Sequence, residues 1–516
     1  MKKKEDRNMT KRLLALLFAF LLIISAVACN DPEVTYKETV GSDSTQTDDY
    51  SDSIQSDSDS NGGGTLKPDG GSNSSSESSS TDNNEDDTPE VYDAVYIDGV
   101  EIENYTLVIP SMDDMYAYYT ALNIIDYLSS TYGYHPLMLT SDMGESKYEI
   151  LIGDTGREES NTGLSFEKGE YTICKKGNKL VLDGYGVYVG AGFGELVSKY
   201  LTKNGEPCFA NIKDIQNTAK KSRFAPTAPA KNVILMIGDG MGFNHVEAAL
   251  KNGYISEFAA KSFTSVGSAV TRSQSVLNGE ATYTDSAAAA TALASGYKTI
   301  NGYIGKDANG NNIQNVRELA DGFGAMTAVV TTDVITGATP GGFLAHNISR
   351  NNTSELQAEI DKLVADGLVD YCEGEVDDKI TDHTRRALLK IAYGEDPFFM
   401  MVEEARIDKR SHDNNITSAM DKVMWYNDAI VYAATYVMID WNTALIVTAD
   451  HETGGLTEDS GSQYGYRYTT GNHTNADVPV YALGYGTEIF NGKATENTDI
   501  AKFIATHFGA ESFGPQ

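Results

Sequence analysis

Short apolar runs alternate with helical patterns through the second half of the chain. Five runs are nearly all apolar and end in polar or glycine residues, which is typical of strands buried on both faces of a sheet. These runs are 232–237, 325–331, 397–402, 443–448 and 478–483. Helical spacing of apolar residues occurs at 286–295, 353–366 and 414–436. The alternation predicts an α/β domain over residues 231–516, with a mostly parallel central sheet sandwiched by helices.

A pattern of shorter elements occupies residues 91–215. It predicts a small α+β domain with one helix at 113–132. Its expected strands are 95–97, 106–109, 148–152 and 179–182. No catalytic constellation accompanies these elements, so attachment, spacing and a purely structural role remain open. Residues 216–230 are rich in alanine, proline and lysine and are expected to be a linker.

The composition changes again before this domain. Serine, aspartate, glycine and asparagine dominate most of residues 30–90. Such a segment cannot bury enough apolar surface to offset the entropy of ordering the chain. It is therefore expected to be a disordered linker.

Residues 1–29 resemble an export signal. Basic residues precede an apolar stretch at 13–28 that is shorter than a membrane span. The stretch ends at Cys29 and resembles a bacterial lipoprotein signal, in which this cysteine becomes lipidated. The small residues just before it also fit an ordinary cleavage site. We expect an exported cell-surface lipoprotein bound to the membrane by its lipid anchor. Free secretion, extracellular or periplasmic, and an uncleaved anchor are the alternatives.

Charge and cysteine content exclude two classes of function. The chain has 74 acidic residues against 40 lysines and arginines, a net charge of -34, which argues against nucleic acid as a partner. Apart from Cys29, the cysteines are Cys174, Cys208 and Cys372, and none lies in a CxxC pair. A thiolate metal site is therefore not expected. Buried free thiols are favoured over a single disulfide.

Candidate chemistry begins at Ser286. Asp285 fits a helix N-cap before an alanine-rich helix, which places Ser286 in the first turn. The free N–H groups and positive dipole end there favour an alkoxide and a phosphate group. An Asp-Ser pair at the start of a helix is common, so this pattern alone does not identify a nucleophile.

Acidic and imidazole side chains gather after the predicted strands. Asp408 and His412 are four residues apart, so on a helical turn they share a face and can bind one metal ion. Asp450 and His451 follow the strand predicted at 443–448, and His473 precedes the one at 478–483. In open α/β sheets, ligands bind at the carboxyl ends of the strands.

Taken together, these residues resemble the alkaline phosphatase family. The resemblance covers essentially all of residues 231 to about 510, in the order of the family. The matching positions are Gly238-Asp239-Gly240-Met241-Gly242, Asp285-Ser286-Ala287, Ala338-Thr339-Pro340, Ser349-Arg350, Glu403, Asp408, His412, Asp450-His451 and His473-Thr474.

The resemblance implies two zinc ions and one magnesium ion in each catalytic domain. By the family pattern, Asp408, His412 and His473 hold the first zinc. Asp239, Asp450 and His451 hold the second, with Ser286 as its exchangeable ligand. Thr339 and Glu403 join Asp239 around the magnesium ion. These residue types fit the ions, because zinc prefers imidazole and carboxylate and magnesium prefers oxygen.

The activity implied is alkaline phosphatase activity, the hydrolysis of phosphate monoesters through a phosphoserine at Ser286. Arg350 would bind two phosphoryl oxygens, and Lys409 would contact the phosphate through water. Gly337 departs from the family, whose members carry Asp or His there, which leaves the identity of the third ion open. Dimerisation is also open, because the domain is short where larger members carry dimer-capping insertions.

Two alternatives remain at this stage. A phosphodiesterase or sulfatase of the same superfamily is the nearest, although Arg350 favours a dianionic monoester and no sulfatase motif follows Ser286. A surface protein that binds phosphate or metal without catalysis would have to lack the nucleophile or a ligand, and none is missing.

Overall fold

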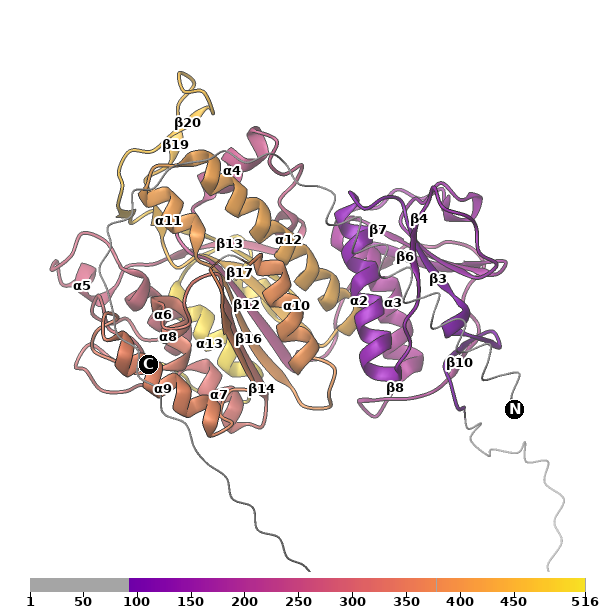
Figure 1. Ribbon diagram of the computed structural model, residues 1–516, viewed down its shortest axis with the longest axis horizontal. Helices are drawn as coiled ribbons and strands as arrows, with labels where there is room; N and C mark the ends of the chain where they lie inside the picture. The colour runs from indigo at the N-terminus through magenta and orange to yellow at the C-terminus, as the bar shows by residue number, and fades with distance from the viewer. Residues whose placement is uncertain (1–91, 377, 516) are drawn as a thin grey trace, which may run out of the picture. The chain divides into compact units, whose positions relative to one another are not determined.

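The computed structural model describes residues 92–376 and 378–515 (Figure 1). The expected signal sequence (1–29) and Ser-rich linker (30–90) lie outside the described residues. Within the described part, no helix is both long enough and apolar enough to cross a membrane. Two main sheets organise this part, one in an N-terminal domain (residues 92–223) and one in a C-terminal domain (residues 232–515).

The C-terminal domain is built on an eight-stranded sheet. In order across the sheet, the strands are β15 (Tyr371–Gly374), β14 (Met326–Thr331), β16 (Phe398–Glu404), β12 (Asn232–Gly238), β17 (Thr443–Thr448), β22 (Val478–Leu483), β13 (Ser265–Val270) and β23 (Ala494–Glu496). The first five are parallel, whereas β22 is antiparallel to both of its neighbours. The predicted α/β fold with a mostly parallel sheet is confirmed.

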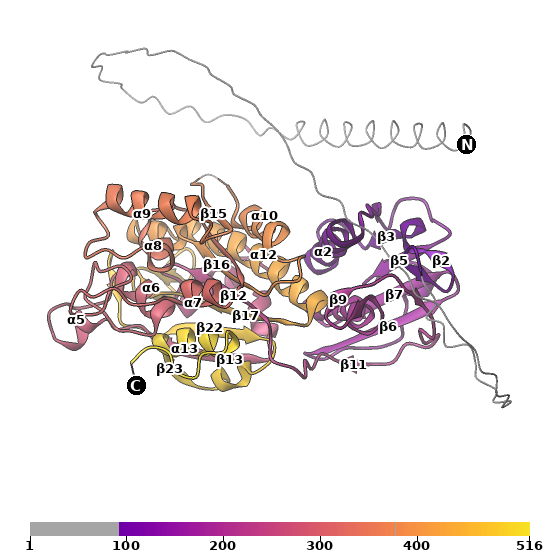
Figure 2. The same ribbon diagram turned by 90° about the horizontal axis from the view of Figure 1, so that it is seen from below.

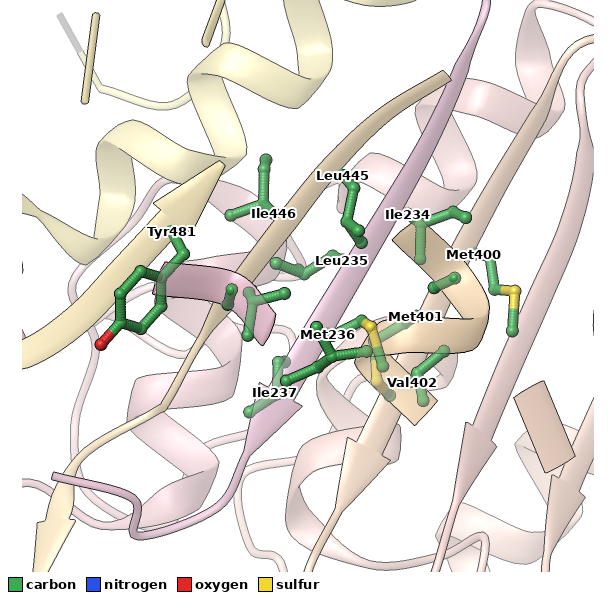
Figure 3. Packing of buried hydrophobic residues seen from close by; sticks show 14 of the residues in the cluster. Ile234, Leu235, Met236, Ile237, Met400, Met401, Val402, Leu445, Ile446 and Tyr481 are labelled. Carbon is green, nitrogen blue, oxygen red and sulfur yellow. The ribbon is translucent and has the colours of Figure 1, made fainter. Parts of the chain in front are cut away.

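The centre of this sheet is buried on both faces. Every residue of β12, β16 and β17 is buried, as the continuous apolar runs predict. Figure 3 shows apolar side chains of these strands, among them Leu235, Met401 and Ile446, packed across neighbouring strands. Burying one such side chain contributes about 1.5–3 kcal/mol. The packed centre fixes the strand ends, where the polar residues follow.

Two groups of helices pack with this sheet (Figure 1). One group comprises α4 (Phe243–Lys251), α10 (Ile380–Ile391), α11 (Arg406–His412) and α12 (Ile416–Asp440). The other comprises α6 (Ser286–Ser295), α7 (Val316–Gly322), α8 (Ala338–Leu344) and α13 (Asn497–His507), with α9 (Thr353–Ala365) against α8. The short helix α5 (Gln274–Leu277) precedes α6. Two pairs of two-residue strands complete the domain: β18 (Glu452–Thr453) with β21 (His473–Thr474), and β19 (Thr457–Glu458) with β20 (Tyr466–Arg467).

The N-terminal domain contains a six-stranded sheet. Its order is β11 (Ser222–Arg223), β6 (Glu170–Lys176), β7 (Lys179–Gly184), β5 (Glu149–Ile152), β3 (Thr106–Ile109) and β4 (Met138–Thr140). The last four strands are parallel, and β6 is antiparallel to β7 and β11. The helices are α2 (Met115–Tyr132) and α3 (Ala191–Leu196). Short strands are β1 (Tyr96–Ile97), β2 (Val100–Glu101), β8 (Thr202–Lys203), β9 (Glu206–Pro207) and β10 (Asn211–Ile212).

Helix α2 of the N-terminal domain lies beside α12 of the C-terminal domain (Figure 1, Figure 2). The buried carboxylate of Asp126 on α2 accepts hydrogen bonds from Arg385 Nε (2.9 Å) and Nη2 (2.7 Å) and from the Tyr432 hydroxyl (2.8 Å). Asn123 Nδ2 donates to Thr435 Oγ1 at 2.8 Å. These polar contacts are buried or half-buried. They tie the N-terminal domain to α10, which carries Arg385, and to α12, which carries Tyr432 and Thr435.

Two expectations need correction. Residues 222–223, inside the expected linker 216–230, form the edge strand β11, and the neighbouring Phe224 is buried against Tyr188 and Trp441. The run at 478–483 forms a strand, as expected, and is antiparallel to both of its neighbours. Cys174, Cys208 and Cys372 are free thiols, and only Cys174 of these is fully buried.

Candidate active site

The predicted ligands stand at the carboxyl ends of three adjacent central strands. Asp239 directly follows β12, Glu403 is the penultimate residue of β16, and Asp450 follows β17 by two residues. Register brings these ends level, because Ile237 pairs with Glu403 on one side and with Thr448 on the other. The three carboxylates are buried at the carboxyl ends of these central strands.

One group of possible metal ligands consists of Asp239, Asp450 and His451. One ligand atom from each lies within 4.8 Å of the others. His451 Nε2 is 3.6 Å from Asp239 Oδ1. Asp239 Oδ1 and Asp450 Oδ2 are buried and have no hydrogen-bond partner among the described residues. Buried oxygens of this kind are costly unless something binds them.

The second group contains Asp408, His451 and His473, whose ligand atoms also lie within 4.8 Å of one another. His412 belongs to the same cluster, because its Nε2 is 3.3 Å from Asp408 Oδ1 and 3.1 Å from His473 Nε2. Asp408 and His412 come from helix α11, whereas His473 comes from β21. His451 therefore stands between the two groups.

Carbonyl oxygens orient two of the imidazoles. His412 Nδ1 donates to the Gly471 carbonyl at 2.7 Å, and His473 Nδ1 donates to the Thr284 carbonyl at 2.8 Å. In both rings this turns Nε2 toward the cluster, which is the arrangement that metal-ligating histidines use.

Ser286 is the first residue of helix α6 and is buried next to these ligands. Its Oγ is 3.1 Å from His451 Nε2. Asp285 caps the helix by accepting the Ala288 N–H at 3.0 Å. The Asp285 carboxylate also lies 3.4 Å from Arg350 Nη1. The capping residue thus holds the candidate nucleophile and the candidate phosphate-binding arginine on the same edge of the site.

A third group lies around Glu403. Thr331, level with Glu403 on the neighbouring strand β14, donates its hydroxyl to Glu403 Oε2. Thr339 on α8 is buried, and its hydroxyl has no hydrogen-bond partner among the described residues. Lys409 pairs with Asp333, which follows β14. The nearby charges of Asp333 and Asp450 both raise the pKa of Glu403.

Burial dominates the electrostatics of the site. It raises the pKa of Asp450 to about 6 and that of Glu403 to about 8. Burial, followed by the charge of Asp450, raises the pKa of Asp239 well above its usual value. Burial also lowers the pKa of His451, so this imidazole is neutral. Burial works in the same sense on Asp408, but contacts with His473 and the other imidazoles lower its pKa overall.

These features fit divalent cations. Buried carboxylates with raised pKa values, unpartnered oxygens and imidazoles with a free nitrogen all gain from a cation that replaces their protons. The Asp239–Asp450–His451 and Asp408–His412–His473 groups have the N and O ligands that zinc uses. Asp239, Thr339 and Glu403 offer only oxygen, which suits magnesium. The individual ligand roles stay predictions.

Comparison with known proteins identifies the family. The sequence model described as alkaline phosphatase matches residues 230–381 and 372–468. The C-terminal domain belongs to the alkaline phosphatase family. Among characterised members, alkaline phosphatase 3 of Bacillus subtilis (strain 168) is 26% identical over 410 residues, covering 53% of this chain and 88% of that protein. Alkaline phosphatase 4 of the same strain is 31% identical over 306 residues, covering 47% of this chain and 66% of that protein.

Alkaline phosphatase structures are also similar. The enzyme from the Antarctic bacterium TAB5 aligns with a TM-score of 0.49 and 26% identity, over 55% of this chain and 99% of that one.

Beyond the family motif, the structure adds Thr453, which donates to Asp408 Oδ1 at 2.5 Å and lies 3.2 Å from His451 Nδ1. Sequence reasoning missed Thr453 and Asp333, and the only local signal for Thr453 is its position two residues after His451.

Proposed function

We propose that this chain is an exported alkaline phosphatase that hydrolyses phosphate monoesters through a phosphoserine on Ser286. One observation carries the proposal: Ser286 Oγ, at the start of helix α6, lies 3.1 Å from His451, the imidazole shared by two groups of buried metal ligands. This arrangement fits phosphoryl transfer, in which catalysis consists mainly of positioning and charge stabilisation.

Three cations complete the proposed site. One zinc ion would be held by Asp408, His412 and His473, a second by Asp239, Asp450 and His451, and a magnesium ion by Asp239, Thr339 and Glu403. When bound, these ions would supply Lewis-acid stabilisation of the oxygens on the reacting phosphorus.

The protein's own groups place the nucleophile. The N-terminus of α6 presents its positive dipole end to the Ser286 oxygen and to an incoming phosphate. Ser286 loses its hydroxyl proton and its Oγ attacks the phosphorus. The bond between phosphorus and the ester oxygen breaks, and that oxygen takes up a proton and leaves as the alcohol. A water molecule then attacks the phosphoserine, the Oγ–P bond breaks, and inorganic phosphate is released.

Arg350 positions the phosphoryl group. Its guanidinium can bind two non-bridging oxygens at once. Its positive charge favours a dianionic monoester over a monoanionic diester. Asp285 Oδ2, 3.4 Å away, holds the guanidinium beside the nucleophile. Lys409 adds a positive charge at the same site and is expected to reach the phosphate through water.

Export and assembly complete the proposal. The signal-like residues 1–29 and the Ser-rich segment 30–90 support a protein that is lipidated at Cys29 and displayed at the cell surface. Free secretion is the alternative. A homodimer is compatible with the family, and sedimentation of the purified protein decides this point.

The test compares three chromogenic substrates with and without EDTA. p-Nitrophenyl phosphate should be hydrolysed, and EDTA should abolish the activity. The bis ester and the sulfate should react at least about a hundredfold more slowly, because each carries one negative charge where the phosphate monoester carries two. Faster cleavage of the diester or the sulfate would replace the proposal with one of the superfamily alternatives.

The nucleophile has its own variant. Ser286→Ala should lose covalent ³²P-phosphate trapped by acid quenching, and its kcat should fall at least about a thousandfold. Ser354→Ala, which changes an exposed serine on α9, serves as the matched control and should keep both. Covalent phosphate in Ser286→Ala would show that another residue is the nucleophile.

A further inference from the structure

Gly337 lies beside the third group of ligands and faces the Asp333 carboxylate. It is the N-cap of helix α8, which carries Thr339. A Cβ atom placed on Gly337 would lie 3.1 Å from Asp333 Oδ2 and 3.0 Å from the Val334 carbonyl oxygen. The space that a longer side chain at position 337 would use is therefore already occupied by the Asp333 carboxylate.

Asp333 is tied directly to this group of ligands. Its backbone N–H donates to Thr331 Oγ1 at 3.0 Å, and the same hydroxyl donates to Glu403. Asp333 is thus two hydrogen bonds away from a predicted ligand of the third cation. The backbone contact fixes the start of its side chain relative to Glu403.

The two carboxylate oxygens of Asp333 have different surroundings. Oδ1 accepts a hydrogen bond from Lys409 Nζ at 2.5 Å, which joins the loop after β14 to helix α11. Oδ2 faces Gly337 and accepts no hydrogen bond from the described residues. Lys409 neighbours the predicted ligand Asp408, so the ion pair connects the third group of ligands with the zinc groups.

We propose that Asp333 is the acidic positioning residue of the third cation site, in place of a carboxylate at Gly337. It holds the magnesium ion through ordered water, and it fixes Lys409 at the phosphate side of the site. The inference rests on the proposed function. A charged oxygen that contacts a metal's water ligands typically changes metal affinity 10–100-fold.

The test measures magnesium binding without substrate. Zinc-loaded protein is titrated with MgCl₂, and bound magnesium is determined by elemental analysis and by the rise in Tm. Asp333→Asn should bind magnesium about tenfold more weakly or worse while keeping its zinc content. Asp366→Asn, which removes the carboxylate of an exposed i,i+4 ion pair with Lys362, is the matched control and should bind magnesium normally.

A compensating variant separates the proposed role from a merely structural ion pair. Asp333→Ser combined with Gly337→Asp moves the carboxylate from position 333 to position 337 and should restore magnesium affinity to within about threefold of the parent, whereas Asp333→Ser alone should not. Unchanged magnesium affinity in Asp333→Asn overturns the inference. If the double variant does not fold, the affinity of Asp333→Asn decides.

Magnesium binding and phosphatase activity are measured separately, so that failure of the inference can be distinguished from failure of the proposed function. A parent protein that binds magnesium in an Asp333-dependent way but cleaves no phosphate ester would refute the proposed function and leave this inference standing. If the parent is an active phosphatase and its magnesium binding does not depend on Asp333, the proposed function stands and this inference is refuted.

Discussion

At the residue scale, the hydroxyl of Thr453 contacts two predicted ligands of different cations. It donates to Asp408 Oδ1 and lies beside His451 Nδ1. Partners of this kind orient metal ligands and determine their basicity. Thr453 and Asp333 could not be predicted from the sequence, because single threonines and aspartates after a strand are ordinary loop residues. Asp239, Asp450 and His451 could be, because they follow apolar strands that must end at one edge.

Thr453→Val tests this support. Valine keeps the shape of threonine but removes the hydroxyl, so Asp408 loses a hydrogen bond and the zinc ligands lose orientation. Zinc should be lost to a competing chelator about 10–100-fold more readily, as measured by a colorimetric chelator titration. Thr469→Val, at an exposed loop threonine, should retain zinc like the parent. If Thr453→Val retained zinc as well as the parent, the Thr453 hydroxyl would have no role in supporting the zinc ligands.

At the element scale, continuous apolar runs identified the central strands, and helical spacing identified α6, α9 and α12. Those elements are long or fully buried, so their pattern is strong. The strands that were missed, such as β13 and β23, are the last two on one side of the sheet, and polar residues interrupt their apolar pattern. Strand direction and the pairing of β11 depend on contacts distant in sequence, which no local pattern records.

The contacts of α2 with α10 and α12 give a prediction at this scale. Arg385→Ala leaves the buried Asp126 carboxylate with only the Tyr432 hydroxyl as a donor. The free energy of unfolding should fall by about 1–3 kcal/mol, because a buried charge loses its partner. Differential scanning calorimetry should show a lower Tm.

Arg410→Ala is the control for this variant. Arg410 is as exposed as Arg385, at 41% of its side chain, but among the described residues its ion pair is with the surface residue Asp413 alone, at 3.8 Å. Its loss should change the free energy of unfolding by less than about 1 kcal/mol. Equal Tm values for the two variants would show that the Asp126 contact does not stabilise the junction.

At the scale of the whole molecule, residues from separate parts of the C-terminal domain meet at one edge of its sheet. Most of the helices and strands of this domain lie between Asp239 and His473 in the sequence, although both residues belong to the same site. The N-terminal domain packs against α12, which directly follows the helix that carries Asp408 and His412. Its position supports a structural role for the N-terminal domain toward the catalytic domain. The central claim is that these distant side chains converge on metal ions.

Anomalous X-ray scattering recorded on both sides of the zinc absorption edge tests this claim most directly. Crystals of the purified protein should show two zinc peaks per chain. One peak should lie among Asp239, Asp450 and His451, and the other among Asp408, His412 and His473. A map without zinc peaks at these two places, from a protein that hydrolyses p-nitrophenyl phosphate, would contradict the account.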